Sequence, residues 1–211
     1  MASRPFHYEK RNAPKSERER PSTLRDWPPC PPIQRDGGGR SRPGVTAGQI
    51  SMIEHLLTQY DTENDAKKRE KLLAGAAVLG AYIKRYGNLL LVSHREETAD
   101  IRDLSRCFED SFVNLELLDV KCLCTLPADV ILATKDMLRI YHTFETIQED
   151  CLFDLHSVWV NARERKGQFL VSIDFVCDTD LSGHKADADL YSCEDGTYRF
   201  TFQLQKGGEG A

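Results

Sequence analysis

The side chains best suited to chemistry in this chain are its cysteines and histidines. Seven cysteines and six histidines are spread along 211 residues. No two cysteines have the C-x-x-C spacing of a zinc knuckle or a thioredoxin-type site, and no His/Cys pair lies at ligand spacing, so we predict no metal site. His55, His142 and His156 each occur alone, and no Ser-His-Asp or Cys-His arrangement has enough local context to predict a nucleophile.

Cys122 and Cys124 are two residues apart in a stretch that alternates apolar and polar residues, Val120–Leu126. That pattern predicts a strand on which both thiols point to one face and act as small hydrophobic groups. The odd number of cysteines and their scattered spacing favour reduced thiols in a cytoplasmic protein. The N-terminus shows no secretory signal, and no apolar run is long enough to span a membrane.

The composition changes abruptly near residue 46. Residues 1–46 hold eight of the nine prolines and a net charge of +5, whereas the remainder carries a net charge of −10. Such a basic, Pro-rich segment cannot bury enough surface to offset the entropy of ordering, so we predict a disordered arm. A Pro-rich docking peptide around Pro28–Pro32 is the functional alternative. The acidic remainder argues against a nucleic-acid-binding protein.

Helical patterning begins near Ala47 and predicts three helices up to residue 118. We expect the first to end at Asp61 and Thr62, which can cap the second, and the second to bend or end at Gly87-Asn88. Thr98 is the expected N-cap of the third helix. The apolar stripes of the last two helices indicate an antiparallel hairpin. The stripe residues expected to carry a homodimer contact are Leu72, Leu79, Ile83, Phe108 and Leu115.

The pattern then changes to strands around one long helix. After the strand Val120–Leu126, we expect a helix from Pro127 to about Glu149, packed on a sheet. Two strands, Ser157–Arg163 and Phe169–Cys177, form a predicted hairpin, and Asp195-Gly196 opens a last strand. The polar residues 178–192 are expected to be a loop. This order of elements predicts an α+β fold.

This order resembles the cytoplasmic region of a bacterial sensor histidine kinase. The stretches AAVLGAYIKRYGNLLL (Ala76–Leu91) and DGTYRFTFQLQKGGEG (Asp195–Gly210) are similar to a degenerate Gram-positive branch of that family. The resemblance covers roughly residues 48–208 and leaves out the disordered arm at 1–46. It implies a dimerisation-like helical hairpin at 47–118 and a degenerate ATPase-like α/β domain of the GHKL type at 119–208.

The resemblance also implies a nucleotide site, whose residues are altered here. The family holds Mg²⁺ and ATP through an asparagine on the long helix, and Asp150 in Glu149-Asp150-Cys151 takes its place. A carboxylate can bind Mg²⁺ but adds negative charge beside the phosphates. The family's Asp-x-Gly-x-Gly box corresponds to residues 178–183, DTDLSG, where Asp178 or Asp180 is the aspartate and the glycine pattern is missing. No Gly-x-Gly lid follows, so no cofactor is expected.

His94, in the stretch SHREET, resembles the family's phosphoacceptor histidine, with Glu96 and Glu97 nearby. The motif's proline is absent, and the polar surroundings indicate an exposed linker. We therefore expect a non-catalytic relative or fragment of a histidine kinase, a pseudokinase of two-component signalling, which is cytoplasmic and dimeric and does not bind nucleic acid. Two alternatives stay open: an active kinase that binds Mg-ATP through Asp150 and Asp178, and an unrelated soluble interaction module.

Overall fold

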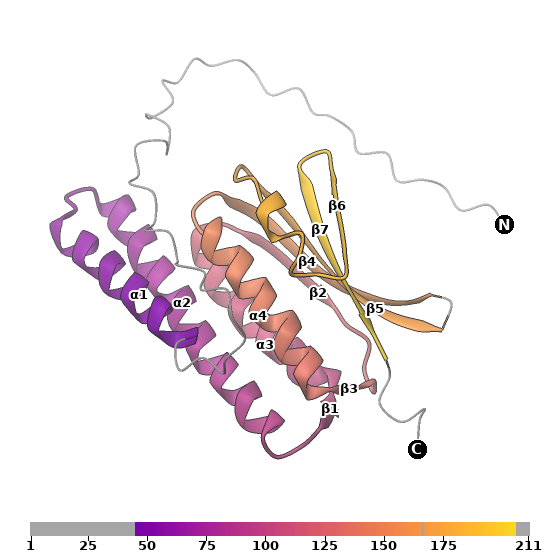
Figure 1. Cartoon of the computed structure of the whole chain (residues 1–211). Helices are drawn as coiled ribbons and strands as arrows, with labels where there is room; N and C mark the ends of the chain where they lie inside the picture. The colour runs from indigo at the N-terminus through magenta and orange to yellow at the C-terminus, as the bar shows by residue number, and fades with distance from the viewer. Residues whose placement is uncertain (1–44, 166, 206–211) are drawn as a thin grey trace. The chain divides into compact units, whose positions relative to one another are not determined.

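The computed structural model describes residues 45–165 and 167–205 (Figure 1). The predicted arm lies outside the described residues except for its last two positions, which begin the first helix. The helices are α1 (Val45–Thr62), α2 (Ala66–Ser93), α3 (Ile101–Leu115) and α4 (Thr134–Asp150), with short 3-10 turns η2 (Glu116–Leu118) and η3 (Ser182–His184). The strands are β1 (Thr98–Asp100), β2 (Lys121–Thr125), β3 (Ile131–Ala133), β4 (Leu155–Arg165), β5 (Gln168–Cys177), β6 (Leu190–Glu194) and β7 (Thr197–Leu204).

The main sheet has the strand order β2-β4-β5-β7-β6. Only β2 and β4 are parallel, and α4 lies in the connection between them, because parallel neighbours need a long crossover. β4, β5, β7 and β6 form antiparallel pairs. The tight β6–β7 turn uses Asp195 and Gly196, both with positive φ, as expected for a two-residue hairpin loop.

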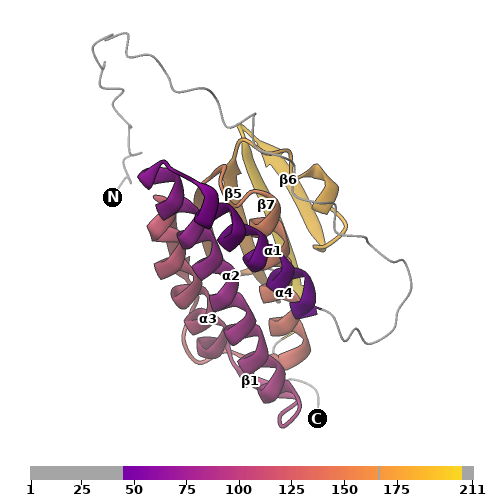
Figure 2. The ribbon, with the colours of Figure 1, turned by 90° about the vertical axis from the view of Figure 1, so that its left-hand side faces the viewer.

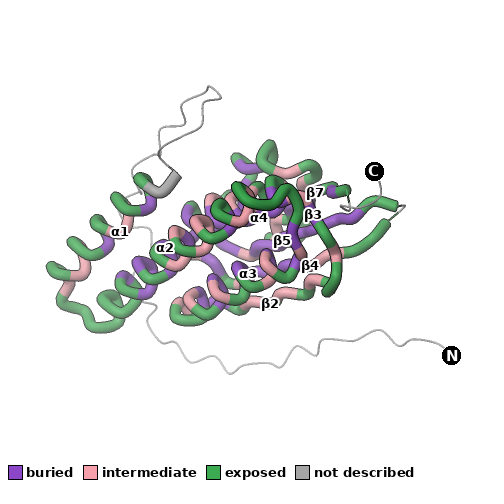
Figure 3. The backbone as a smooth tube through the Cα atoms, turned by 90° about the horizontal axis from the view of Figure 1, so that it is seen from below, coloured by how far each residue is buried: buried purple, intermediate pink, exposed green. Residues whose placement is uncertain are grey.

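The helices lie on one face of the sheet (Figure 1). α3 and α4 cover this face, α2 packs on both, and α1 packs on α2 (Figures 2 and 3). Alternating residues of β4 and β5, such as Val160 and Ile173, enter the core from the sheet. No described element covers the other face, where Trp159 is 55% exposed. The predicted α+β class, a helical hairpin followed by an α/β sandwich, is confirmed.

Several predicted boundaries are wrong because residues distant in sequence set them. α2 is capped by Asp65, whose side chain accepts from the backbone of Lys67 and Lys68, and α2 continues past Gly87 to Ser93. Asp100 caps α3, while Thr98 belongs to β1, which pairs with β3. That pairing uses residues we had expected in the long helix, so α4 begins at Thr134 rather than at Pro127. The loop expected at 178–192 contains η3 and the start of β6.

The predicted domain boundary near residue 118 falls within one continuous core. Residues of α2, α3, α4 and the sheet belong to the same buried cluster. Phe144 on α4 contacts Phe108 on α3 and Phe175 on β5, with ring centroids 5.1 and 6.0 Å apart. α3 is therefore part of the α/β sandwich, and the hairpin that packs on it is formed by α1 and α2.

Gly75 allows α1 to approach α2 closely. A Cβ atom at this position would lie 2.9 Å from the ring of Phe153 and 3.3 Å from Leu56 of α1. We expect Gly75→Leu to lower the free energy of unfolding by about 1–3 kcal/mol, because this side chain has no room. Gly80→Leu is the control, since nothing lies within 4 Å of its Cβ position. Urea denaturation of both variants measures the difference, and equal stabilities would contradict the proposed close approach.

Candidate functional site

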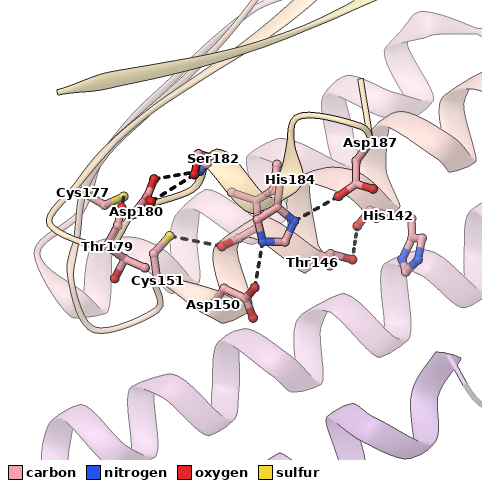
Figure 4. A network of polar contacts seen from close by, with 11 residues as sticks. His142, Thr146, Asp150, Cys151, Cys177, Thr179, Asp180, Ser182, His184 and Asp187 are labelled. Atoms are coloured by element: carbon pink, nitrogen blue, oxygen red, sulfur yellow. Dashed lines mark hydrogen bonds and ion pairs between the residues drawn. The ribbon is translucent and has the colours of Figure 1, made fainter. Parts of the chain in front are cut away.

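The C-terminal end of α4 meets the segment that joins β5 to β6. This β5–β6 segment, residues 178–189, crosses the end of α4 and contains η3 (Figure 4). It starts beside the chain that leaves α4, because Asp178 N–H donates to Asp154 O at 3.3 Å. The Thr179 hydroxyl also donates to Asp154 Oδ2 at 3.1 Å. The structure therefore brings together Asp150 and the residues that follow β5, which were the two stretches predicted to form a nucleotide site.

His184 links this segment to α4. Its side chain is only 3% exposed, and it lies with Nε2 2.7 Å from Asp150 Oδ2 and Nδ1 3.0 Å from Asp187 Oδ2 (Figure 4). A carboxylate oxygen accepts a hydrogen bond, so these two contacts favour a ring that is protonated on both nitrogens. The hydrogen bond to Asp150 is the main cause that raises the pKa of His184, and burial opposes it. The buried His184 ring thus joins the carboxyl groups of Asp150 and Asp187.

The two aspartates that could stand in the family's adenine box are engaged elsewhere. The Asp178 side chain is 78% exposed and pairs with His156 Nε2 at 3.2 Å. Asp180 accepts from the backbone N–H of Ser182 at 2.9 Å and from its hydroxyl at 3.0 Å. The backbone hydrogen bond is the main cause that lowers the pKa of Asp180. Asp150 therefore contacts His184, and His184 in turn contacts Asp187. Neither Asp178 nor Asp180 is among the hydrogen-bond partners of Asp150.

His94 caps the C-terminal end of α2. It is exposed, and its backbone N–H donates to Leu90 O at 3.1 Å. It lies far in sequence from Asp150, and a phosphoacceptor role for it stays a hypothesis. Within residues 45–165 and 167–205, no three His, Cys, Asp or Glu side chains are grouped so that they could hold a metal ion.

A second polar cluster is buried where α4 meets the other helices. Glu145 is 1% exposed and accepts from Ser111 Oγ of α3 at 2.9 Å and from Gln148 Nε2 at 3.1 Å. Glu149 is 5% exposed and accepts from Gln49 Nε2 of α1 at 2.8 Å. Burial raises the pKa of Glu145 to about 8 and that of Glu149 to about 7. The amide oxygens of Gln49 and Gln148 are buried without a hydrogen-bond partner.

This cluster favours neutral carboxyl groups. Burial penalises the charged form of both Glu145 and Glu149. The cluster contains residues of α1, α3 and α4. It therefore connects the hairpin to the sandwich through hydrogen bonds rather than through ion pairs.

The residues predicted to carry a dimer contact are mostly buried inside one chain. Leu72, Leu79, Phe108 and Leu115 are at most 1% exposed, and Ile83 is partly buried against the same core. The prediction that these residues touch a partner is wrong for the four buried ones, because their stripes are covered by the chain's own helices. Homodimerisation itself stays a prediction. The large apolar side chains that α1 and α2 leave exposed are Ile50, Leu57, Leu73, Leu90 and Leu91.

Sequence reasoning missed His184, Asp187 and the buried glutamates. The His184–Asp187 spacing of three residues is a local signal, but it is common on charged surfaces. The Asp150 partner is 34 residues away in the chain, so only the tertiary structure reveals it. Glu145 and Glu149 lie on the apolar stripe of α4, and this placement of acids was the signal that could have indicated burial.

No protein-family model and no curated protein matches this chain. Solved histidine kinase structures do resemble it. One is the Acinetobacter baumannii histidine kinase AdeS, with 12% identity, a TM-score of 0.41 and coverage of 75% of this chain and 95% of that one. Another is the histidine kinase domain of the Erythrobacter litoralis EL346 blue-light activated histidine kinase, with 10% identity, a TM-score of 0.40 and coverage of 74% and 95%.

A structure described as a bacterial phosphotransferase is also similar, with 10% identity, a TM-score of 0.44 and coverage of 74% of this chain and 89% of that one. No helix in the described part of the chain is both long and apolar enough to cross a membrane.

Proposed function

We propose that this chain is a histidine-kinase-like signalling module that does not bind ATP and acts through contacts with other proteins in the cytoplasm. One observation supports the proposal most directly. The buried His184 ring lies against the end of α4, with Nε2 2.7 Å from Oδ2 of Asp150. The resemblance implies that Asp150 would face Mg²⁺ in an active relative. Here the partner of Asp150 is His184, a side chain of the chain itself.

The residues present do not fit Mg-ATP. Phosphate binding relies on backbone N–H groups that glycines let approach the ligand, and the β5–β6 segment lacks the family's glycine pattern. Asp180 already accepts a hydrogen bond from Ser182 of the same segment, and Asp178 pairs with His156 of β4. A nucleotide would have to displace the bridge from His184 to Asp150 and Asp187. The six described cysteines are free, which suits a reducing compartment.

Calorimetric titration of the full chain with Mg-ATP near neutral pH tests this proposal. We expect no binding tighter than about 1 mM for the native protein. We expect the same for His184→Ala, because removing the bridge does not create the missing phosphate-binding backbone. Glu116→Gln, at an exposed residue of η2 away from both stretches, is the control. Micromolar binding that Asp150→Ala abolishes would refute the proposal and support the active kinase.

A further inference from the structure

Cys151 and Cys177 are brought together at the start of the β5–β6 segment. Cys151 follows the last residue of α4, and Cys177 is the last residue of β5. Two backbone features fix this juxtaposition: Cys177 lies opposite Leu155 in the β4–β5 pair, and Asp178 N–H donates to Asp154 O. Both thiols are free, and Figure 4 shows their sulfur atoms side by side. Cys151 Sγ donates to Ile147 O and Cys177 Sγ donates to Thr179 O, both at 3.2 Å.

The two sulfur atoms are chemically unequal. The neighbouring Cys151 thiol is the main cause that lowers the pKa of Cys177. The neighbouring Cys177 thiol, followed by burial, raises the pKa of Cys151 well above its usual value. Cys177 is also the more accessible of the two, at 8% exposure against 1%. Cys177 is therefore the first to form a thiolate, and the thiolate is the nucleophile in cysteine oxidation.

We propose that Cys151 and Cys177 form a redox modification site, in which a hydroperoxide oxidises the two thiols to an intramolecular disulfide. The Cys177 thiolate attacks one oxygen of the hydroperoxide, an S–O bond forms, the O–O bond breaks and the released alkoxide takes up a proton as an alcohol, or as water from hydrogen peroxide. Cys151 Sγ then attacks the Cys177 sulfenic acid, the S–S bond forms and the S–O bond breaks. The leaving hydroxide takes the Cys151 proton and becomes water. The thiols lose two electrons, which the peroxide gains.

The disulfide would join the start of the β5–β6 segment to the end of α4. Cys151 neighbours Asp150, which already holds the same segment through His184. The segment would then be fixed to α4 at two adjacent residues, one link covalent and one ionic. This inference does not depend on whether the chain binds ATP.

The test uses the full chain with Cys30→Ser and Cys193→Ser, which removes the exposed Cys193 and the one cysteine outside the described residues. The reduced protein is treated with one equivalent of hydrogen peroxide and digested without reduction. We expect a loss of about 2 Da, two fewer alkylatable thiols and one linked peptide pair that contains Cys151 and Cys177. Dithiothreitol should restore both thiols.

Single replacements test the roles of the two sulfurs. In Cys151→Ser, we expect a sulfenic acid at Cys177 that dimedone captures. In Cys177→Ser, Cys151 should stay reduced under the same treatment. Cys124→Ser is the control and should leave the linked pair intact. Both thiols remaining reduced in the folded protein, a disulfide to another cysteine, or a link that forms only in urea would overturn the proposal. The native sequence, treated in the same way, shows whether the two background replacements affect the result.

Discussion

Raising the pH from about 5 to about 8 should lower the free energy of unfolding of this protein by about 6 kcal/mol. The cause is the buried pair Glu145 and Glu149, whose folded pKa values of about 8 and about 7 lie above the ordinary value of 4.5. In the unfolded chain both acids ionise above about pH 4.5, whereas in the folded chain they stay protonated. Their contribution is therefore complete below that pH, and it is lost as the pH rises to the folded values.

The groups that face this pair do not reverse the sign. Glu145 is faced by Tyr82 of α2, Tyr141 of α4 and Ser111 of α3, and Glu149 is faced by Gln49 of α1 and the neighbouring Asp150. The raised pKa of His184 acts in the same direction, because that contribution is also lost as the pH rises.

Denaturation in urea at several pH values measures this slope. Glu145→Gln keeps the side-chain shape without a proton to lose, so we expect it to remove more than half of the slope. Glu116→Gln, an exposed glutamate of η2, is the matched control and should keep the native slope. A stability that rises from pH 5 to 8 in the native protein would show that the buried acids are ionised in the fold.

Replacing Phe144 with alanine should cost about 3–5 kcal/mol of stability. The Phe144 side chain is fully buried and its ring contacts four others, those of Phe108, Phe112, Tyr141 and Phe175. Because these rings come from α3, α4 and β5, the cavity would weaken the helical layers and the sheet together. Native-state hydrogen exchange should report the same loss of protection in α2 and in β5.

Trp159→Ala is the control for this prediction. It removes a larger side chain, but Trp159 is 55% exposed on the uncovered face of the sheet, so we expect a change within about 1 kcal/mol. If Phe144→Ala lowered protection in β5 and left α2 unchanged, the hairpin and the sandwich would have separate cores, as the predicted domain boundary near residue 118 implied.

The elements that the sequence predicts well are those with a strong local period. β4 and β5 alternate along their length, and the Asp195-Gly196 turn belongs to a two-residue hairpin, so these strands were found nearly at their true positions. The apolar stripe of α2 likewise indicated a long helix. Its period could not indicate whether the stripe faces a second chain or the chain's own α3 and α4.

The features that were missed depend on contacts between distant residues. β1 and β3 are three residues each and pair across more than thirty positions, so no local pattern marks them. Pro127 suits a first helical turn, yet the residues after it pair with β1 instead, and α4 starts later. At the site, the sequence indicated Asp150 and Asp178 separately. The contact that joins Asp150 to the β5–β6 segment depends on His184, which only the folded chain brings close.

The most direct test of the central claim is an NMR titration of the ¹⁵N-labelled full chain with Mg-ATP. The bridge predicts that the backbone amides of residues 178–189 and of the C-terminal turn of α4 keep their shifts up to about millimolar nucleotide. It also predicts that both ring nitrogens of His184 stay protonated throughout. Saturating shifts at micromolar Mg-ATP, centred on Asp150 and the β5–β6 segment, would show that the site binds nucleotide and would contradict the account.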